Sequence, residues 1–263
     1  MSDPVELFTH QLGAGKPLMI LHGLFGSGRN WAGIARQLGA RHRVHVLDAR
    51  NHGASPWVPT MSYLDMAHDL AAYIDALGRG PADIIGHSMG GKTAMTLALT
   101  RPELVRQLIV VDIAPVTYRG SAQDPYSAYI AAMQGLNLSL IRRRSEADAA
   151  LSDVIADAAM RAFLVQNLEP VAGGYRWRIN LEAIAANLSE LTSFPQLDGQ
   201  FDGLATVLAG ELSDYVRPRD EPAIRHYFPK SRIIVIDGAG HWPHADQPER
   251  LLALLRETLE GAQ

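Results

Sequence analysis

Short runs of apolar residues, rich in isoleucine and valine, alternate along the chain with longer stretches of helical spacing. Such runs are typical of buried parallel strands, which need crossover helices between them. The alternation therefore predicts an α/β fold built on a mostly parallel sheet. Six runs are clear, and a weaker pair is expected within residues 5–12, which predicts eight strands in all. The clear runs are residues 17–21, 44–47, 83–85, 108–111, 206–209 and 232–236.

The strand pattern stops between residues 117 and 197, where alanine-rich helical stretches replace it. An insertion of this length after a sheet strand is expected to cover the carboxyl ends of the strands, where the sites of open α/β sheets lie. We therefore expect a core formed by residues 1–116 and 200–263. Residues 117–199 are expected to form a helical cap, or lid, inserted after the sixth strand.

Composition excludes several classes of function. The chain has no cysteine, which rules out disulfides, thiolate metal sites and a cysteine nucleophile. Its formal net charge of −4 provides no basic field for nucleic acid. The acidic N-terminus does not resemble a targeting peptide, and no apolar run approaches the roughly 18 residues of a membrane span. We expect a cytoplasmic protein.

Residues 86–93, GHSMGGKT, fit two motifs. One is the phosphate-binding loop of nucleotide hydrolases, and the other is the Gly-x-Ser-x-Gly elbow that carries a nucleophilic serine. His87 and Met89 are bulky for a loop whose N–H groups must all turn toward a phosphate. An elbow instead needs small residues two positions before and after its serine, and glycines occupy both places. The pattern favours Ser88 as a nucleophile.

Two further segments have a role only beside a nucleophilic serine. The first, residues 22–27, directly follows a predicted strand and offers main-chain N–H groups to a developing oxyanion. Met89 and Leu24 are the expected donors, with Phe25 as a less favoured alternative to Leu24. The second, residues 238–244, follows the last predicted strand and places His241 at the same edge of the sheet, where its imidazole can take the serine proton.

Several segments together resemble the small α/β-hydrolase esterases of the YbfF type. The resemblance covers the core, roughly residues 15–116 and 200–260, and is weak through the cap. It implies an α/β-hydrolase fold and hydrolysis of carboxylesters or thioesters with short acyl groups. The segments that carry it are LHGLFGS with Asn30-Trp31, DARNHG at 48–53, GHSMGGK at 86–92 and VDIAP at 111–115.

Two aspartates compete to complete a Ser-His-acid triad. Asp214 follows the strand that commonly supplies the acid in this fold, but it lies one residue beyond the usual place, which Ser213 occupies. Asp112 ends the strand beside the nucleophile strand, and neighbouring strands are only ~4.8 Å apart. The resemblance favours Asp112, because esterases of the YbfF type take the acid from the matching segment.

The expected reaction needs no metal and no organic cofactor, since serine, imidazole and main-chain N–H groups suffice for acyl transfer. The expected partner is a small-molecule ester or thioester, whose acyl length the sequence does not indicate. Nor does it indicate an oligomeric state. The substrate pocket is expected to involve apolar side chains near the serine, namely Phe25, Trp31, Trp177 and Trp242.

Two rival functions remain open from the sequence. A carbon–carbon lyase or hydrolase of the same fold would share Ser88 and His241 but act on an anionic metabolite. Residues 142–144, Arg176 and Arg178 offer the positive charge for such a substrate. A P-loop nucleotide hydrolase, which is the less favoured alternative, would instead depend on Lys92.

Overall fold

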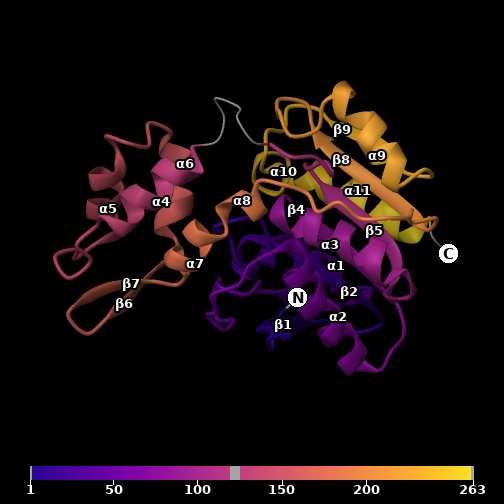
Figure 1. The fold of residues 1–263 in the computed structure, drawn as a ribbon, viewed down its shortest axis with the longest axis horizontal. Helices are drawn as coiled ribbons and strands as arrows, with labels where there is room; N and C mark the ends of the chain where they lie inside the picture. The colour runs from indigo at the N-terminus through magenta and orange to yellow at the C-terminus, as the bar shows by residue number, and fades with distance from the viewer. Residues whose placement is uncertain (1, 119–124, 262–263) are drawn as a thin grey trace.

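The computed structural model describes residues 2–118 and 125–261 (Figure 1). Its centre is a sheet with strand order β1-β3-β2-β4-β5-β8-β9. β1 runs antiparallel to β3, and the other neighbouring strands are parallel. The strands are β1 (Thr9–Leu12), β2 (Lys16–Leu21), β3 (His42–Leu47), β4 (Ala82–His87), β5 (Val105–Val111), β8 (Leu204–Gly210) and β9 (Arg232–Ile236).

The mostly parallel α/β sheet predicted from the sequence is confirmed, but it has seven strands within the described residues instead of the expected eight. The difference lies before β2, where only Thr9–Leu12 forms a strand. Val5 and Leu7 pack against the core without joining the sheet, and the Val5 N–H donates to the Asp69 carboxylate at 2.8 Å. The long insertion consequently follows β5, the fifth strand of the chain, and not the sixth.

Alternate residues of the central strands face opposite sides of the sheet, as a two-residue period requires. Met19 and Ile84 pack on the side covered by α2 (Tyr63–Leu77), α3 (Met89–Thr100) and α9 (Glu221–Tyr227). Ile20 and Ile85 pack on the side covered by α1 (Ala32–Leu38) and α11 (Pro248–Glu260). Both faces are buried, which explains why the strand sequences are continuously apolar.

The insertion between β5 and β8 lies to the left of the sheet in Figure 1 and has a core of its own. That core also includes Phe25 and Met89, so it is continuous with the segments around Ser88. The expected loss of all strands is wrong, because a short antiparallel hairpin, β6–β7, lies within the insertion. Its elements are α4 (Tyr126–Gln134), α5 (Arg144–Leu151), α6 (Ala158–Val165), β6 (Leu168–Val171), β7 (Gly174–Trp177), α7 (Leu181–Ala186) and α8 (Leu188–Leu191).

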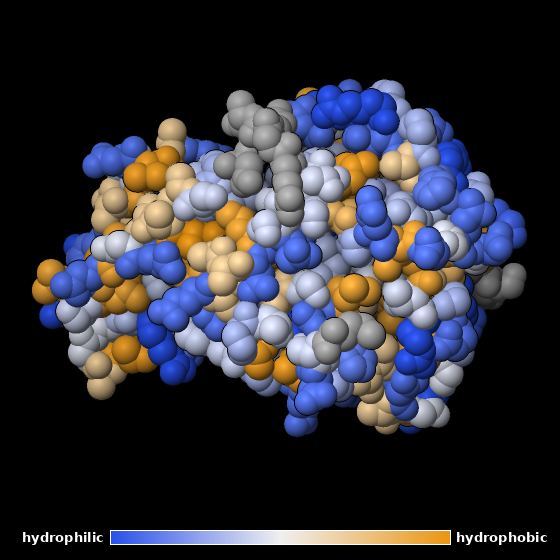
Figure 2. All heavy atoms as spheres, viewed as in Figure 1, coloured by the Kyte–Doolittle hydropathy of each residue, from blue (hydrophilic) through white to orange (hydrophobic). Residues whose placement is uncertain are grey.

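Apolar residues gather more densely on the surface of the insertion than over the sheet on the face seen in Figure 2. Three large apolar side chains of the insertion, Leu140, Val154 and Val171, are exposed. No helix in the described part of the chain combines the length and the apolar character needed to cross a membrane.

Candidate active site

Ser88 lies on a strained turn between β4 and α3. Its φ of 52° and ψ of −117° place a non-glycine residue outside the usual regions. The flanking glycines are sterically required, because a Cβ at Gly86 would lie 2.3 Å from the Gly90 carbonyl oxygen. A Cβ at Gly90 would lie 2.6 Å from that of Leu21. The chain thus passes itself closely and holds Ser88 at the carboxyl edge of the sheet, which is the geometry of a nucleophile elbow.

The same segment does not form a phosphate-binding cradle. The Gly90 N–H donates to the His22 carbonyl at 3.1 Å, and the Lys92 N–H donates to the Ser88 carbonyl at 3.0 Å. The Lys92 side chain is buried and donates to the main-chain carbonyls of Val116 and Ser193. Two of the main-chain N–H groups that a phosphate would need, those of Gly90 and Lys92, are therefore already used within the fold.

Ser88, His241 and Asp112 form a continuous line of hydrogen bonds. His241 Nδ1 lies 2.8 Å from Asp112 Oδ2, and His241 Nε2 lies 3.1 Å from Ser88 Oγ. A carboxylate only accepts hydrogen bonds, so Nδ1 carries the proton and Nε2 is free to accept from the serine hydroxyl. This arrangement has the order and the atoms of a serine hydrolase triad.

The two aspartates have different surroundings. Asp112 is fully buried, and its Oδ1 accepts from the Gly210 N–H at 2.8 Å while its Oδ2 also accepts from the Ser213 hydroxyl. Asp214 has a side chain that is 53% exposed and pairs with Arg217. The structure thus brings Asp112, and not Asp214, to the imidazole of His241.

The main-chain N–H groups of Leu24 and Met89 are unengaged. Neither donates a hydrogen bond to any described residue. The Phe25 N–H, by contrast, donates to His52 Nε2 at 3.2 Å. Of the two alternatives in the loop after β2, Leu24 is therefore the residue with an available donor, and Met89 supplies a second at the start of α3.

Four other histidines near the site are held neutral by burial. Burial lowers the pKa of His22, takes that of His52 to about 3 and that of His244 to about 4, and lowers that of His87 well below the usual value. His22 Nε2 accepts from the Ala49 N–H at 3.0 Å, and His87 Nε2 donates to the His241 carbonyl at 2.7 Å. These side chains position main chain around the site.

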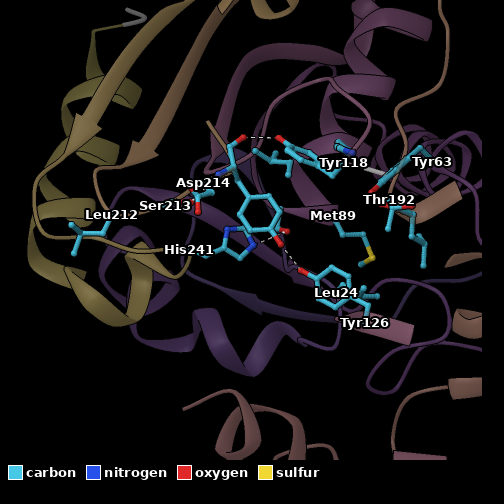
Figure 3. Close-up of a pocket in the computed structure, with 15 residues that line it drawn as sticks. Leu24, Tyr63, Met89, Tyr118, Tyr126, Thr192, Leu212, Ser213, Asp214 and His241 are labelled. Atoms are coloured by element: carbon cyan, nitrogen blue, oxygen red, sulfur yellow. Dashed lines mark hydrogen bonds between the residues drawn. The ribbon is translucent and has the colours of Figure 1, made fainter. Parts of the chain in front are cut away.

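A cavity of about 340 Å³ opens beside Ser88 and is shown in Figure 3. Met89 lies between His241 on one side and Tyr63 and Thr192 on the other in this view. The cavity is mostly apolar, as expected of a pocket for a small organic molecule. Its lining comprises Leu24, Tyr63, Ser88, Met89, Lys92, Ile113, Tyr118, Tyr126, Leu191, Thr192, Leu212, Ser213, Asp214, Tyr215 and His241.

The four aromatic residues expected in the pocket divide between two places. Phe25, Trp31 and Trp242 line a second, smaller cavity that also touches Ser88 and His241. Trp177 lies elsewhere, which corrects the prediction for this residue. Its indole N–H donates to the Met133 carbonyl at 3.2 Å within the core of the insertion, because β7 directs the ring inward.

The arginines considered for an anionic substrate do not line either cavity at Ser88. Arg143 pairs with Glu146, Arg144 donates to the Leu168 carbonyl, and Arg176 pairs with Glu169. Lys92 and the catalytic-site candidate His241 are the basic residues that line the larger cavity in the described chain.

Sequence reasoning missed three residues that shape the site. Tyr215 stacks on His241, Ser213 donates to Asp112, and Tyr118 donates to the Tyr215 carbonyl. The unusual serine three residues after Gly210 was a signal for the second of these, since it occupies the usual place of the acid. No spacing pattern indicates the other two.

Comparison with known proteins agrees with this geometry. The family model described as the alpha/beta hydrolase fold matches residues 16–248. The sn-1-specific diacylglycerol lipase ABHD11 of Mus musculus is 43% identical over 88% of this chain and 77% of its own length. Esterase YbfF of Escherichia coli is 34% identical over 92% of each chain.

A solved structure described as a marine microorganism esterase superposes with a TM-score of 0.93. It is 41% identical to this chain and covers 97% of it, and the match spans 99% of that structure's chain. The resemblance to YbfF-type esterases that the core motifs indicated is thereby confirmed. The chain belongs to the alpha/beta hydrolase fold family, together with the esterases and lipases to which it is similar.

Proposed function

We propose that the protein is a serine esterase that hydrolyses carboxylesters, and by the same chemistry thioesters, with short-to-medium acyl groups. The observation that carries the proposal is the hydrogen-bonded line from Asp112 through His241 to Ser88. The esterase and lipase descriptions of its relatives support the reaction class. The acyl length rests on the cavity of about 340 Å³, which suits a small substrate better than a long lipid chain.

The reaction proceeds in two steps through an acyl-enzyme. His241 Nε2 takes the proton of the Ser88 hydroxyl as its oxygen attacks the ester carbonyl. The N–H groups of Leu24 and Met89 donate to the oxyanion of the tetrahedral intermediate. His241 returns the proton to the leaving alcohol or thiol, and then activates the water that hydrolyses the acyl-enzyme. Asp112 holds the imidazole in the required tautomer throughout.

We infer that the insertion expected at residues 117–199, of which 119–124 lie outside the described residues, acts as a cap over this site. Support comes from the shared apolar core, which joins the insertion to Phe25 and Met89. The Asn167 side chain of the insertion also donates a hydrogen bond to the Phe25 carbonyl at 2.7 Å. A cap that packs on the loop after β2 limits water around the oxyanion, which strengthens the hydrogen bonds that stabilise it.

Covalent labelling tests the proposal directly. A fluorophosphonate should modify Ser88, identified by mass spectrometry of the labelled peptide, and Ser88→Ala should abolish labelling and turnover together. Ser139→Ala is a matched control, because this exposed serine hydrogen-bonds, among the described residues, only with Asn137 and Arg142 of the insertion. Turnover of p-nitrophenyl esters by Ser88→Ala at the wild-type rate would refute the assignment.

The rival functions have less support. Among the described residues, no arginine lines the cavities at Ser88, so the cluster that a polyanionic substrate needs is absent there. A nucleotide hydrolase needs a loop of several free N–H groups around the phosphate, and those of Gly90 and Lys92 are already used. A panel of p-nitrophenyl esters and acyl-CoA thioesters, with ATP as the competing substrate, separates these functions.

A further inference from the structure

Lys92 is buried in the same cavity as Ser88. It lies one helical turn after the serine on α3, and its side chain is 1% exposed. Nζ donates to the Val116 carbonyl at 2.8 Å and to the Ser193 carbonyl at 2.6 Å. An ammonium group has three donors, so one remains beyond these two carbonyls.

The positive charge of Lys92 has no anionic partner in residues 2–118 and 125–261. The rings of Tyr63 and Tyr118 lie 5.5 Å and 4.7 Å from Nζ, and their faces offset part of the charge. A buried charge without a counter-charge is destabilising, and burial accordingly lowers the pKa of Lys92 to about 7. An anion that enters the cavity would supply the missing partner.

The other polar side chains at this end of the cavity are already satisfied. The Tyr63 hydroxyl donates to the Leu191 carbonyl at 2.6 Å, and the Thr192 hydroxyl donates to the Leu188 carbonyl at 3.1 Å. The Tyr118 hydroxyl donates to the Tyr215 carbonyl and accepts from the Ala114 N–H. Lys92, whose Nζ lies beside the rings of Tyr63 and Tyr118, is therefore the charged donor available to a ligand at this end of the cavity.

We propose that Lys92 determines specificity by binding a carboxylate on the substrate arm that extends from the scissile carbonyl past Met89. The preferred substrates are then monoesters with one free carboxylate. This inference rests on the proposed esterase function and specifies its substrate class. The carboxylate is carried either by the acyl group or by the alcohol, because the cavity adjoins Ser88, where the ester bond between these two groups is cleaved.

Two matched substrate pairs test the inference and distinguish these sources. Monomethyl glutarate against methyl pentanoate places the charge on the acyl side, and 4-acetoxybutanoate against butyl acetate places it on the alcohol side. The series from monomethyl succinate to monomethyl suberate varies the distance between the ester carbonyl and the free carboxylate. For wild-type protein near pH 6, we expect kcat/KM to favour the charged member of one pair by about tenfold or more, the range for a hydrogen bond to a charged group.

Variants assign that preference to Lys92. Lys92→Met removes the charge at similar length, and the charged-to-neutral ratio of kcat/KM should fall about tenfold. Lys92→Arg should retain a preference, and Lys230→Met, at an exposed lysine paired with Asp202, should leave the ratio unchanged. If Lys92→Met does not fold, Lys92→Gln and the wild-type comparison decide instead.

The ratio should also fall as pH rises from 6 to 9, because the ammonium loses its proton. Burial raises the pKa values of Tyr63 and Tyr118 above this range, so neither hydroxyl loses its proton between pH 6 and 9. Asp214, paired with Arg217, and His241 also line the cavity and interact differently with a charged and a neutral substrate. The pH profile of the ratio in Lys92→Met contains their contribution alone, so the difference between the wild-type and Lys92→Met profiles isolates Lys92.

The outcomes separate this inference from the function on which it rests. If a fluorophosphonate labels Ser88 and neutral esters are hydrolysed, but neither charged substrate is preferred, the role of Lys92 is refuted and the esterase stands. An equal preference in wild type and Lys92→Met also refutes it. If Ser88 is unlabelled and no ester is hydrolysed, both proposals fall.

Discussion

The phenol ring of Tyr215 stacks on the imidazole of His241, with ring centroids 3.9 Å apart and planes inclined by 25°. The Tyr215 hydroxyl also lies 2.6 Å from the hydroxyl of Tyr126, at the start of α4 in the insertion. Asp112 fixes the edge of the imidazole that carries Nδ1, and Tyr215 covers one of its faces. The stack thus restricts the ring in a direction that the hydrogen bond alone leaves free.

Shortening the aromatic side chain at this stack is expected to slow the enzyme. Aromatic pairs contribute about 0.5–1.5 kcal/mol beyond their buried area, so Tyr215→Leu should lower kcat roughly two- to tenfold. Tyr215→Phe keeps the stack and removes only the hydroxyl, and should have the smaller effect. Steady-state kinetics on a p-nitrophenyl ester provide the measurement. Equal losses in the two variants would mean that the hydroxyl, and not the ring face, matters.

The identity of the acid is testable by a matched pair of substitutions. Asp112→Asn removes the carboxylate that holds His241, and the loss of a triad acid costs ~10⁴ in kcat. Asp214→Asn breaks an exposed ion pair with Arg217, which is worth at most about 1 kcal/mol of stability and should leave kcat within roughly threefold. The reverse ranking would assign the acid to Asp214.

Gly86 at the elbow and Gly33 in α1 differ in the space available to a Cβ, so alanine substitutions at these two glycines are expected to have opposite effects. At Gly86, a Cβ would lie 2.3 Å from a main-chain oxygen, so Gly86→Ala should destabilise the protein by about 1–3 kcal/mol and abolish turnover. At Gly33, in α1, a Cβ would have no neighbouring atom within 4 Å, and Gly33→Ala should stabilise by about 0.5 kcal/mol. Urea unfolding measures the stability of both variants. A Gly86→Ala protein that is stable and active would contradict the tight turn.

The strands and the pairing of Ser88 with His241 could be predicted from the sequence because local patterns indicate them. Apolar runs mark β2, β3, β4, β5, β8 and β9, and residues that follow parallel strands gather at one edge of the sheet. Neither inference needs knowledge of how distant loops pack.

The structure of the insertion and its contacts could not be predicted as well from the sequence. The hairpin β6–β7 has four residues per strand, includes Pro170, and lacks the long apolar runs of the core strands. The stack of Tyr215 on His241 and the contact of Lys92 with Ser193 join segments far apart in sequence. Trp177 was misplaced for the same reason, because helical and aromatic content does not state which side chains face the cavity.

His244 predicts how stability depends on pH. Its ring stacks on Trp31 with centroids 4.8 Å apart, and its Nδ1 is buried without a partner in the described chain. Burial, and secondarily the nearby His241, lower its pKa to about 4 from a usual value of 6.5. Between these two pH values the unfolded state binds more protons than the folded state, so the free energy of unfolding rises with pH in this window. His52, with a pKa of about 3, adds a contribution of the same sign.

The free energy of unfolding of the wild type should therefore fall as pH decreases from 6.5 toward 4. His244→Phe keeps a ring on Trp31 but has no site for the proton, so it should lose less stability over the same range. We expect a difference of about 1–2 kcal/mol between the two proteins to develop across this window, measured by urea unfolding at a series of pH values. His226→Phe, at an exposed histidine, should retain the wild-type slope. Parallel curves for the wild type and His244→Phe would show that His244 does not couple folding to proton binding, because the coupling requires a proton site whose affinity differs between the folded and unfolded states.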